Sequence, residues 1–195
     1  MLIVITGLDG SGTSSIAKKL HETNPDSYLF RTPSVEFTDR GNIDTVVRKE
    51  SSTAHMLYYL SSVVYISDYI KKHCDYKNKN VYVLRYLIDT VVSNRAAGIP
   101  IELDYTVYGN NLLQPDLTIF VELEEEERER RILSRGKDVL DEVLDNEKKR
   151  EKFLHEYENL LDKEKTIYIK NNKDLNEVIS ELNEKIKEFA PKIKE

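Results

Sequence analysis

The sequence predicts an α/β fold in which a mostly parallel, five-stranded sheet carries helices on both faces. Short apolar runs alternate with longer segments of helical pattern along the whole chain, as in proteins built from strand–helix–strand units. The chain has 195 residues, enough for one domain with a substantial core. No repeat or low-complexity block interrupts the alternation, so we expect a single domain over residues 1–195.

Five runs have the length and the β-branched composition of buried strands. The first opens the chain, and the second follows a turn at Asn24-Pro25-Asp26. The third and fourth also follow polar turns, the fourth one at Gln114-Pro115-Asp116. The expected strands are residues 2–6, 27–31, 81–84, 117–121 and 166–169.

Six longer segments are predicted to be helical. Residues 55–72 are apolar over too great a length for a strand, which favours a buried helix. Gly136 is expected to end one helix, and Asp174 to cap the last. Residues 34–50 are polar and weakly patterned, so we expect a loop with a short helix there. The expected helices are residues 14–23, 55–72, 86–97, 124–135, 142–162 and 174–189.

Composition excludes several classes of protein. The net charge is −6, which argues against a generic nucleic-acid binder. The single cysteine, Cys74, excludes a disulfide framework and fits a reducing compartment. The sequence has no signal peptide and no apolar run of about 18 residues. We therefore expect a cytoplasmic protein with neither a membrane nor a nucleic acid as partner.

A glycine-rich loop joins the first expected strand to the first expected helix. Gly7, Gly12 and Ser14 match the phosphate-loop spacing G-x-x-x-x-G-K-[ST], with Thr13 in place of the lysine. Glycine lets a backbone approach an anion closely, and the N–H groups and dipole of a helix N-terminus favour phosphate. We therefore expect nucleotide phosphates to be bound by Gly7, Leu8, Asp9, Gly10, Ser11, Gly12, Thr13, Ser14 and Ser15, with Ser14 also a ligand of Mg²⁺.

The missing lysine removes one cation from beside the β- and γ-phosphates. A charge-assisted hydrogen bond contributes roughly 1.5–3 kcal/mol. The chain must therefore supply another cation, catalyse slowly, or bind a nucleotide without catalysis. Lys18 and Lys19 lie on other faces of the expected helix, so Arg131 or Arg135 is the better substitute.

Several arginines occupy positions where they can meet phosphate. Arg31 and Arg85 lie at the carboxyl ends of expected strands, where α/β sheets bind ligands and a guanidinium can clamp phosphate with two hydrogen bonds. Arg131 and Arg135 are four residues apart, so one helix face presents both. The alternative for this pair is a solvated helix laced with salt bridges.

The order of these features resembles the thymidylate kinases. The resemblance runs from residue 1 to about residue 189, and it implies a P-loop NTPase-type, three-layer fold with a lid at about residues 129–142. It also implies transfer of the γ-phosphoryl group of Mg-ATP to dTMP, and commonly a homodimer. The matching landmarks are Gly7–Gly12, Arg31-Thr32-Pro33, Arg85-Tyr86, Pro115-Asp116-Leu117 and Arg131-x-x-x-Arg135-Gly136.

The same resemblance implies roles for individual residues. Asp9 would contact the 3′-hydroxyl of the monophosphate, Tyr59 would stack on the base, and Asn94 would read the base edge. Each has a plainer alternative: an exposed loop aspartate, a core tyrosine and an exposed helix asparagine. The monophosphate site implied in this way comprises Asp9, Arg31, Tyr59, Arg85 and Asn94, and the catalytic residues are Arg85, Arg131 and Arg135.

Three positions depart from the family pattern. Thr13 replaces the loop lysine, Leu84 replaces an aspartate before Arg85, and Val63 replaces an arginine on the long helix. Each change removes a polar group. Two hypotheses therefore stay open: a working deoxynucleoside monophosphate kinase, for dTMP or another base, and a catalytically weak homologue that only binds nucleotides.

Overall fold

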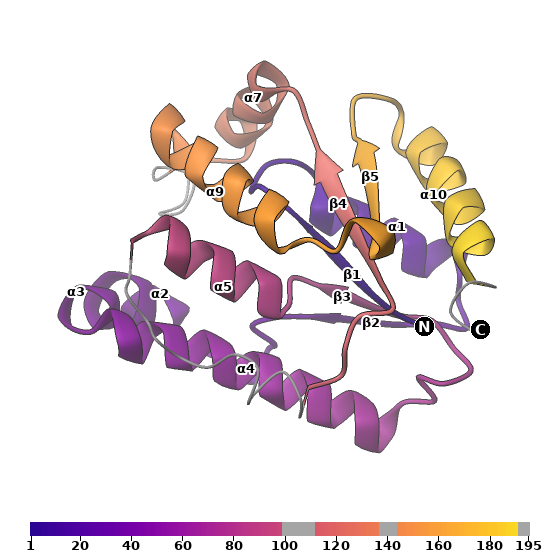
Figure 1. The fold of residues 1–195 in the computed structure, drawn as a ribbon, viewed down its shortest axis with the longest axis horizontal. Helices are drawn as coiled ribbons and strands as arrows, with labels where there is room; N and C mark the ends of the chain where they lie inside the picture. The colour runs from indigo at the N-terminus through magenta and orange to yellow at the C-terminus, as the bar shows by residue number, and fades with distance from the viewer. Residues whose placement is uncertain (99–111, 137–143, 191–195) are drawn as a thin grey trace.

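The computed structural model describes residues 1–98, 112–136 and 144–190 of the chain. Within these residues, five strands form one sheet: β1 (Leu2–Gly7), β2 (Tyr28–Arg31), β3 (Val81–Leu84), β4 (Leu117–Glu122) and β5 (Thr166–Lys170). All pairings are parallel, and the order across the sheet is β2-β3-β1-β4-β5 (Figure 1). The predicted five-stranded parallel sheet is confirmed, and each strand begins and ends within one residue of the expected bounds.

The central strand β1 is the point where the strand order reverses. Ile3 pairs with Tyr82 of β3 on one side and with Leu117 of β4 on the other. The chain therefore builds one half of the sheet on each side of β1. Ligands of open α/β sheets bind at the carboxyl ends of the strands beside such a reversal, so the fold itself points to the end of β1.

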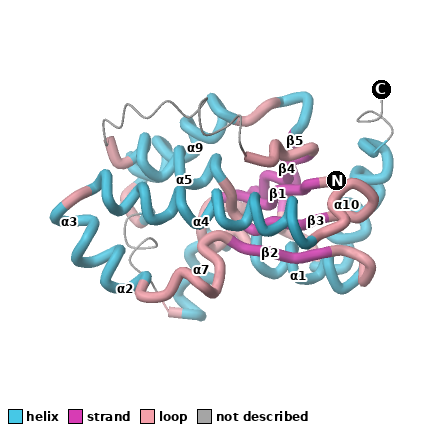
Figure 2. Tube along the Cα trace, turned by 90° about the horizontal axis from the view of Figure 1, so that it is seen from below, coloured by secondary structure: helices cyan, strands magenta, loops and turns pink. Residues whose placement is uncertain are grey.

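Both faces of the sheet are buried. Ile3 and Ile5 of β1 pack with α1 (Thr13–Thr23) and α10 (Leu175–Phe189), while Leu2 and Val4 face α4 (Ser52–His73). A third apolar cluster, with α5 (Leu87–Ala96) and α9 (Glu147–Leu160), lies on the α4 side. Helices thus lie on both sides of the strands (Figure 2), and strands covered on both faces are apolar almost throughout.

The helices follow the sequence prediction closely. α4 begins three residues earlier than expected, because the Ser51 side chain accepts a hydrogen bond from the Ala54 N–H. α7 (Glu125–Arg135) ends before Gly136 as predicted, and a short 3₁₀ turn, η2 (Lys163–Lys165), leads into β5. The exception is the helix expected over residues 142–162: α9 spans only Glu147–Leu160, because Asn146 caps it by accepting a hydrogen bond from the Lys149 N–H. Residues 142 and 143 lie outside the described residues. Among the described helices, none has the length and apolarity needed to cross a membrane.

Residues 40–50 contain more helix than the sequence predicted. Three short elements follow one another without a break: α2 (Arg40–Asn42), the π-helical η1 (Ile43–Val47) and α3 (Arg48–Glu50). None of their side chains is fully buried, and the half-buried positions 43, 44, 47 and 48 mix apolar with charged residues, so hydrophobic periodicity alone did not predict a helix here. A π turn is uncommon and is often found at functional sites.

Candidate active site

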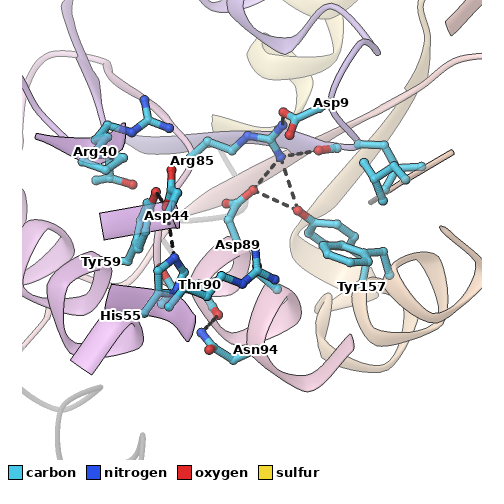
Figure 3. A pocket seen from close by; sticks show the side chains of 18 of the residues that line it. Asp9, Arg40, Asp44, His55, Tyr59, Arg85, Asp89, Thr90, Asn94 and Tyr157 are labelled. Atoms are coloured by element: carbon cyan, nitrogen blue, oxygen red, sulfur yellow. Dashed lines mark hydrogen bonds and ion pairs between the residues drawn. The ribbon is translucent and has the colours of Figure 1, made fainter. Parts of the chain in front are cut away.

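A cavity of about 360 Å³ opens at the carboxyl ends of β1, β2 and β3. One end is lined by Gly7, Leu8 and Asp9, where the phosphate loop between β1 and α1 begins, together with Arg85. The other end is formed by α2, η1, α3 and the first turns of α4, with α5 beside them (Figure 3). We call these the loop end and the helical end of the cavity.

The phosphate loop leads directly into the N-terminus of α1. Gly12 is the N-cap of α1, with φ 96°, and no side chain caps the helix. The first N–H groups of α1 therefore lack side-chain partners, which suits them to a phosphate group. Ser14 and Ser15 in the first turn are exposed, whereas Thr13 is only 6% exposed. The backbone features predicted for this loop are present, and Thr13 supplies no cation.

Neighbouring elements cover the outer side of this loop. A Cβ atom on Gly12 would lie 2.2 Å from Asn171 Nδ2, and one on Gly10 would lie 2.8 Å from Ile132. The Asn171 amide also donates to the Ser11 carbonyl at 2.7 Å. Both glycines have positive φ, so a side chain there would be strained as well as crowded. Asn171 and α7 thus hold the loop from outside.

Arg85 lies at the junction of the two ends. Its Nη2 donates to Asp9 Oδ1 at 2.6 Å, and its Nη1 donates to Asp89 Oδ1 at 2.8 Å and to the Gly7 carbonyl. Asp89 Oδ1 also accepts from Thr6 at 2.6 Å and from Tyr157 at 2.9 Å. Figure 3 shows Arg85 reaching between Asp9 and Asp89. The predicted Arg85 and Asp9 therefore meet directly. Asp89, a carboxylate that the sequence did not single out, holds Arg85 from its other side.

The electrostatics of this junction fix its protonation states. Burial alone would lower the pKa of Arg85, but Asp9 and Asp89 outweigh it and raise that pKa. Burial, then the charge of Asp89, raises the pKa of Tyr157. Arg85 thus stays cationic, and Tyr157 keeps the proton that it donates. Arg85 adopts φ 65°, uncommon for a residue with a side chain, and its ion pairs hold it there.

The helical end is lined by charged and aromatic side chains around Asp44. Asp44 Oδ1 accepts from the Tyr59 hydroxyl at 2.6 Å and lies 3.0 Å from His55 Nε2. Burial alone would raise the pKa of Asp44, but hydrogen bonds from His55 and Tyr59 outweigh it and lower that pKa. Arg40 also faces the cavity. The Tyr59 ring lines the cavity beside an ionised carboxylate.

Of the two remaining residues predicted to bind the monophosphate, one lines the cavity and the other does not. Asn94 lines the cavity and is buried, with its Nδ2 donating to the Thr90 carbonyl at 2.7 Å. Arg31 does not line the cavity, since its Nε donates to the Pro33 carbonyl at 3.2 Å and the residue is exposed. The structure therefore brings together Asp9, Tyr59, Arg85 and Asn94, but not Arg31.

Of the two catalytic arginines predicted on α7, Arg131 lies against the outer side of the loop, and it also pairs with Glu127 at 2.8 Å, as the salt-bridge alternative predicted. Arg131 Nη1 would lie 3.3 Å from a Cβ atom on Gly12, and its Nη2 donates to the Asn171 carbonyl at 3.0 Å. Arg135, one turn further on, is exposed. Residues 137–142 of the predicted lid lie outside the described residues. Arg128, on the same helix, is only 1% exposed.

Two departures from the family pattern prove to be core positions. Val63 is fully buried between α4 and the sheet, and Leu84 packs against the core on the α1 side. Neither lines the cavity. Their apolar character therefore follows from packing in this chain, and Thr13 is the one of the three that lies in the phosphate-binding helix turn.

Sequence reasoning missed the residues that complete the site. Asp89 stands four residues after Arg85 on α5, and Arg40, Asp44 and Arg48 recur at the same spacing. A spacing of four places side chains on one helix face, and this was the available signal. It was hidden because residues 40–50 did not read as a helix. The missed residues are Arg40, Asp44, Arg48, His55, Asp89 and Tyr157.

Comparison with known proteins decides the family. A family model described as "Thymidylate kinase" matches residues 5–182. This chain belongs to the thymidylate kinase family. A probable thymidylate kinase of Pyrobaculum calidifontis is 28% identical over 139 residues, covering 69% of this chain and 70% of the relative. One from Methanococcus maripaludis is 27% identical over 148 residues, covering 72% and 69% respectively.

Solved structures agree with this thymidylate kinase fold. The Candida albicans thymidylate kinase superposes with a TM-score of 0.69 at 22% identity, covering all of this chain and 93% of that one. A deoxyadenosine kinase from M. mycoides gives 0.67 at 19% identity, covering 96% of this chain and 100% of that one. At such identities the likeness establishes the fold. Family membership makes the chain a nucleoside monophosphate kinase, as the sequence resemblance predicted.

Proposed function

We propose that this protein transfers the γ-phosphoryl group of Mg-ATP to dTMP, giving dTDP and ADP. The observation that carries the proposal is one cavity that runs from the start of the phosphate loop, at Gly7–Asp9, to a polar, aromatic-lined wall, with Arg85 at the junction. ATP would place its phosphates on the loop, and the monophosphate would occupy the rest of the cavity. The family match supports both nucleotides.

The chain's own residues act by positioning and by charge. The acceptor is a phosphate oxygen, already ionised near neutral pH, so no general base is required. Arg85, held by Asp9 and Asp89, would orient that phosphate toward the loop. Arg131 and Arg135 would supply positive charge for the transferring group, in place of the lysine absent at Thr13. These roles remain predictions.

The loop region also fits Mg²⁺ bound together with ATP. Mg²⁺ usually keeps several waters and takes one or two protein oxygens besides phosphate oxygens. The exposed hydroxyl of Ser14, in the first turn of α1, is the protein oxygen suited to it. Bound there, the ion would neutralise charge on the phosphates.

A direct assay tests the proposal. Coupled phosphoryl transfer with Mg-ATP is measured against dTMP, dUMP, dCMP, dGMP and dAMP, with Thr13→Lys alongside. We expect the fastest turnover with dTMP. Turnover of another acceptor would transfer the proposal to that base. Binding of ATP without turnover of any acceptor would overturn it in favour of a nucleotide-binding homologue, and rescue by Thr13→Lys would locate the defect in the loop.

A homodimer in the cytoplasm is a further part of the proposal. The sequence resemblance implies a homodimer, and α4 leaves two apolar side chains for a second copy to cover, Leu57 at 44% exposed and Tyr69 at 39% exposed. Light scattering at several concentrations measures the mass, and a monomer throughout would contradict the dimer.

A further inference from the structure

Arg128 is the largest side chain of the described residues that is almost fully buried, with 1% of its side-chain surface exposed. It lies on α7, but its side chain contacts the phosphate loop. Its Nη1 donates to the Asp9 carbonyl at 3.0 Å. Its Cγ would lie 3.0 Å from a Cβ atom on Gly10. The guanidinium and its stem therefore cover the Asp9–Gly10 peptide from the outer side of the loop.

The Asp9–Gly10 peptide is a sensitive point of the loop. A peptide unit is planar, so fixing the Asp9 carbonyl also fixes the direction of the Gly10 N–H. A cationic donor on the carbonyl also polarises the unit, which strengthens that N–H as a donor. Asp9 is also held through its side chain, whose carboxylate pairs with Arg85.

Arg128 is itself held in a network of charges. Its Nε and Nη2 donate to the two carboxylate oxygens of Glu125, at 2.8 and 2.7 Å. The same carboxylate lies 3.2 Å from Arg150 Nε, and Arg150 Nη1 donates to the Leu144 carbonyl at 2.9 Å. Two guanidinium groups thus share one carboxylate. The network runs from the phosphate loop to Leu144, which lines the cavity.

A gain in folding stability does not explain why Arg128 is buried in this network. Buried ion pairs add little net stability, because desolvation offsets most of the attraction. We propose that Arg128 is a positioning residue for nucleotide binding: it fixes and polarises the Asp9–Gly10 peptide, so that the loop binds phosphate without the usual lysine. This inference rests on the proposed function only in taking the loop as the ATP site.

The experiment compares two arginines of one helix. Arg130 forms the same two-pronged pair with Glu127, at 2.6 and 2.7 Å, but its side chain is 71% exposed. Arg128→Met keeps the apolar stem and leaves Glu125 beside Arg150, while Arg130→Met is the matched control. Calorimetric titration with ATP and ADP, steady-state kinetics and thermal unfolding are measured for both.

We expect Arg128→Met to weaken ATP binding about tenfold, the size of one charge-assisted hydrogen bond, and to raise the KM for ATP more than the KM for dTMP. Arg130→Met should match the wild type. Arg128→Lys, which keeps the charge and one donor, should recover part of the affinity. A merely structural role would lower the unfolding temperature and leave the affinity of the folded fraction unchanged.

Unchanged ATP affinity in Arg128→Met, or equal losses in Arg128→Met and Arg130→Met, would overturn the inference. If Arg128→Met does not fold, Arg128→Lys decides: native affinity overturns the inference, and reduced affinity with a native unfolding temperature supports it. Wild-type protein that binds ATP but phosphorylates no dTMP would overturn the proposed function, while the binding comparison would still test Arg128.

Discussion

The loop end and the helical end of the cavity are built by different means. The loop end is where the phosphate loop begins, and that loop is mostly backbone: consecutive residues with positive-φ glycines that lead to a helix N-terminus. The helical end is made of side chains, with Asp44 and Tyr59 contributed by separate helical elements. Arg85 joins the two. A backbone site tolerates a changed side chain such as Thr13, whereas a side-chain site depends on each residue.

Replacing Arg85, the residue at the junction of the two ends, should have the largest effect on activity. We expect Arg85→Ala to lower kcat by about 10²–10³-fold, the cost of losing one donor aimed at developing charge. It should also destabilise the fold by about 3 kcal/mol, since Asp9 and Asp89 would be left without their partner. Coupled assay and chemical unfolding measure both quantities.

Arg95→Ala is the control for this change. Its pair with Glu156 is 3.7 Å long and half exposed, so it should cost less than about 1 kcal/mol. Equal losses in the two variants would show that Arg85 has no special place between the two ends.

The cations of α7 test whether the loop end works without its lysine. We expect Arg131→Ala and Arg135→Ala each to lower kcat about tenfold or more, because each would remove a charge near the transferring phosphoryl group. Arg130→Met serves as the control on the same helix. Turnover unchanged in both alanine variants would show that these arginines do not replace the lysine.

A substitution at the helical end should weaken binding of the acceptor dTMP and leave ATP binding unchanged. Tyr59→Phe keeps the ring but removes the hydroxyl that donates to Asp44 at 2.6 Å. We expect the KM for dTMP to rise about tenfold, with little change in the KM for ATP. Tyr58→Phe is the control, because the Tyr58 hydroxyl donates to the exposed Thr38 carbonyl instead. A parallel rise in both KM values would mean that the two ends are not separate.

The smallest expected effect concerns pH. The pKa of Asp44 is lowered in the folded protein, so its contribution to stability is complete above the unfolded pKa of about 3.9 and is lost as pH falls through the lower, folded value. The difference in unfolding free energy between wild type and Asp44→Asn should be constant near pH 5 and shrink below about pH 4. A difference that grows on acidification would contradict this assignment.

The sequence by itself determined the sheet, most of its helices and the loop end. Strand and helix patterns are local, and the phosphate loop is a run of consecutive residues from Gly7 to Ser15, so spacing alone exposes it. Arg85 was predictable for the same reason, because it directly follows an apolar strand.

Only the tertiary structure decided the rest of the site. Asp44 and His55 become neighbours when η1 packs beside α4. Tyr157 reaches Asp89 because α9 packs against α5. The burial of Arg128 depends on α7 packing over a loop more than a hundred residues away in sequence. Such contacts follow from packing between distant segments, which no local pattern records.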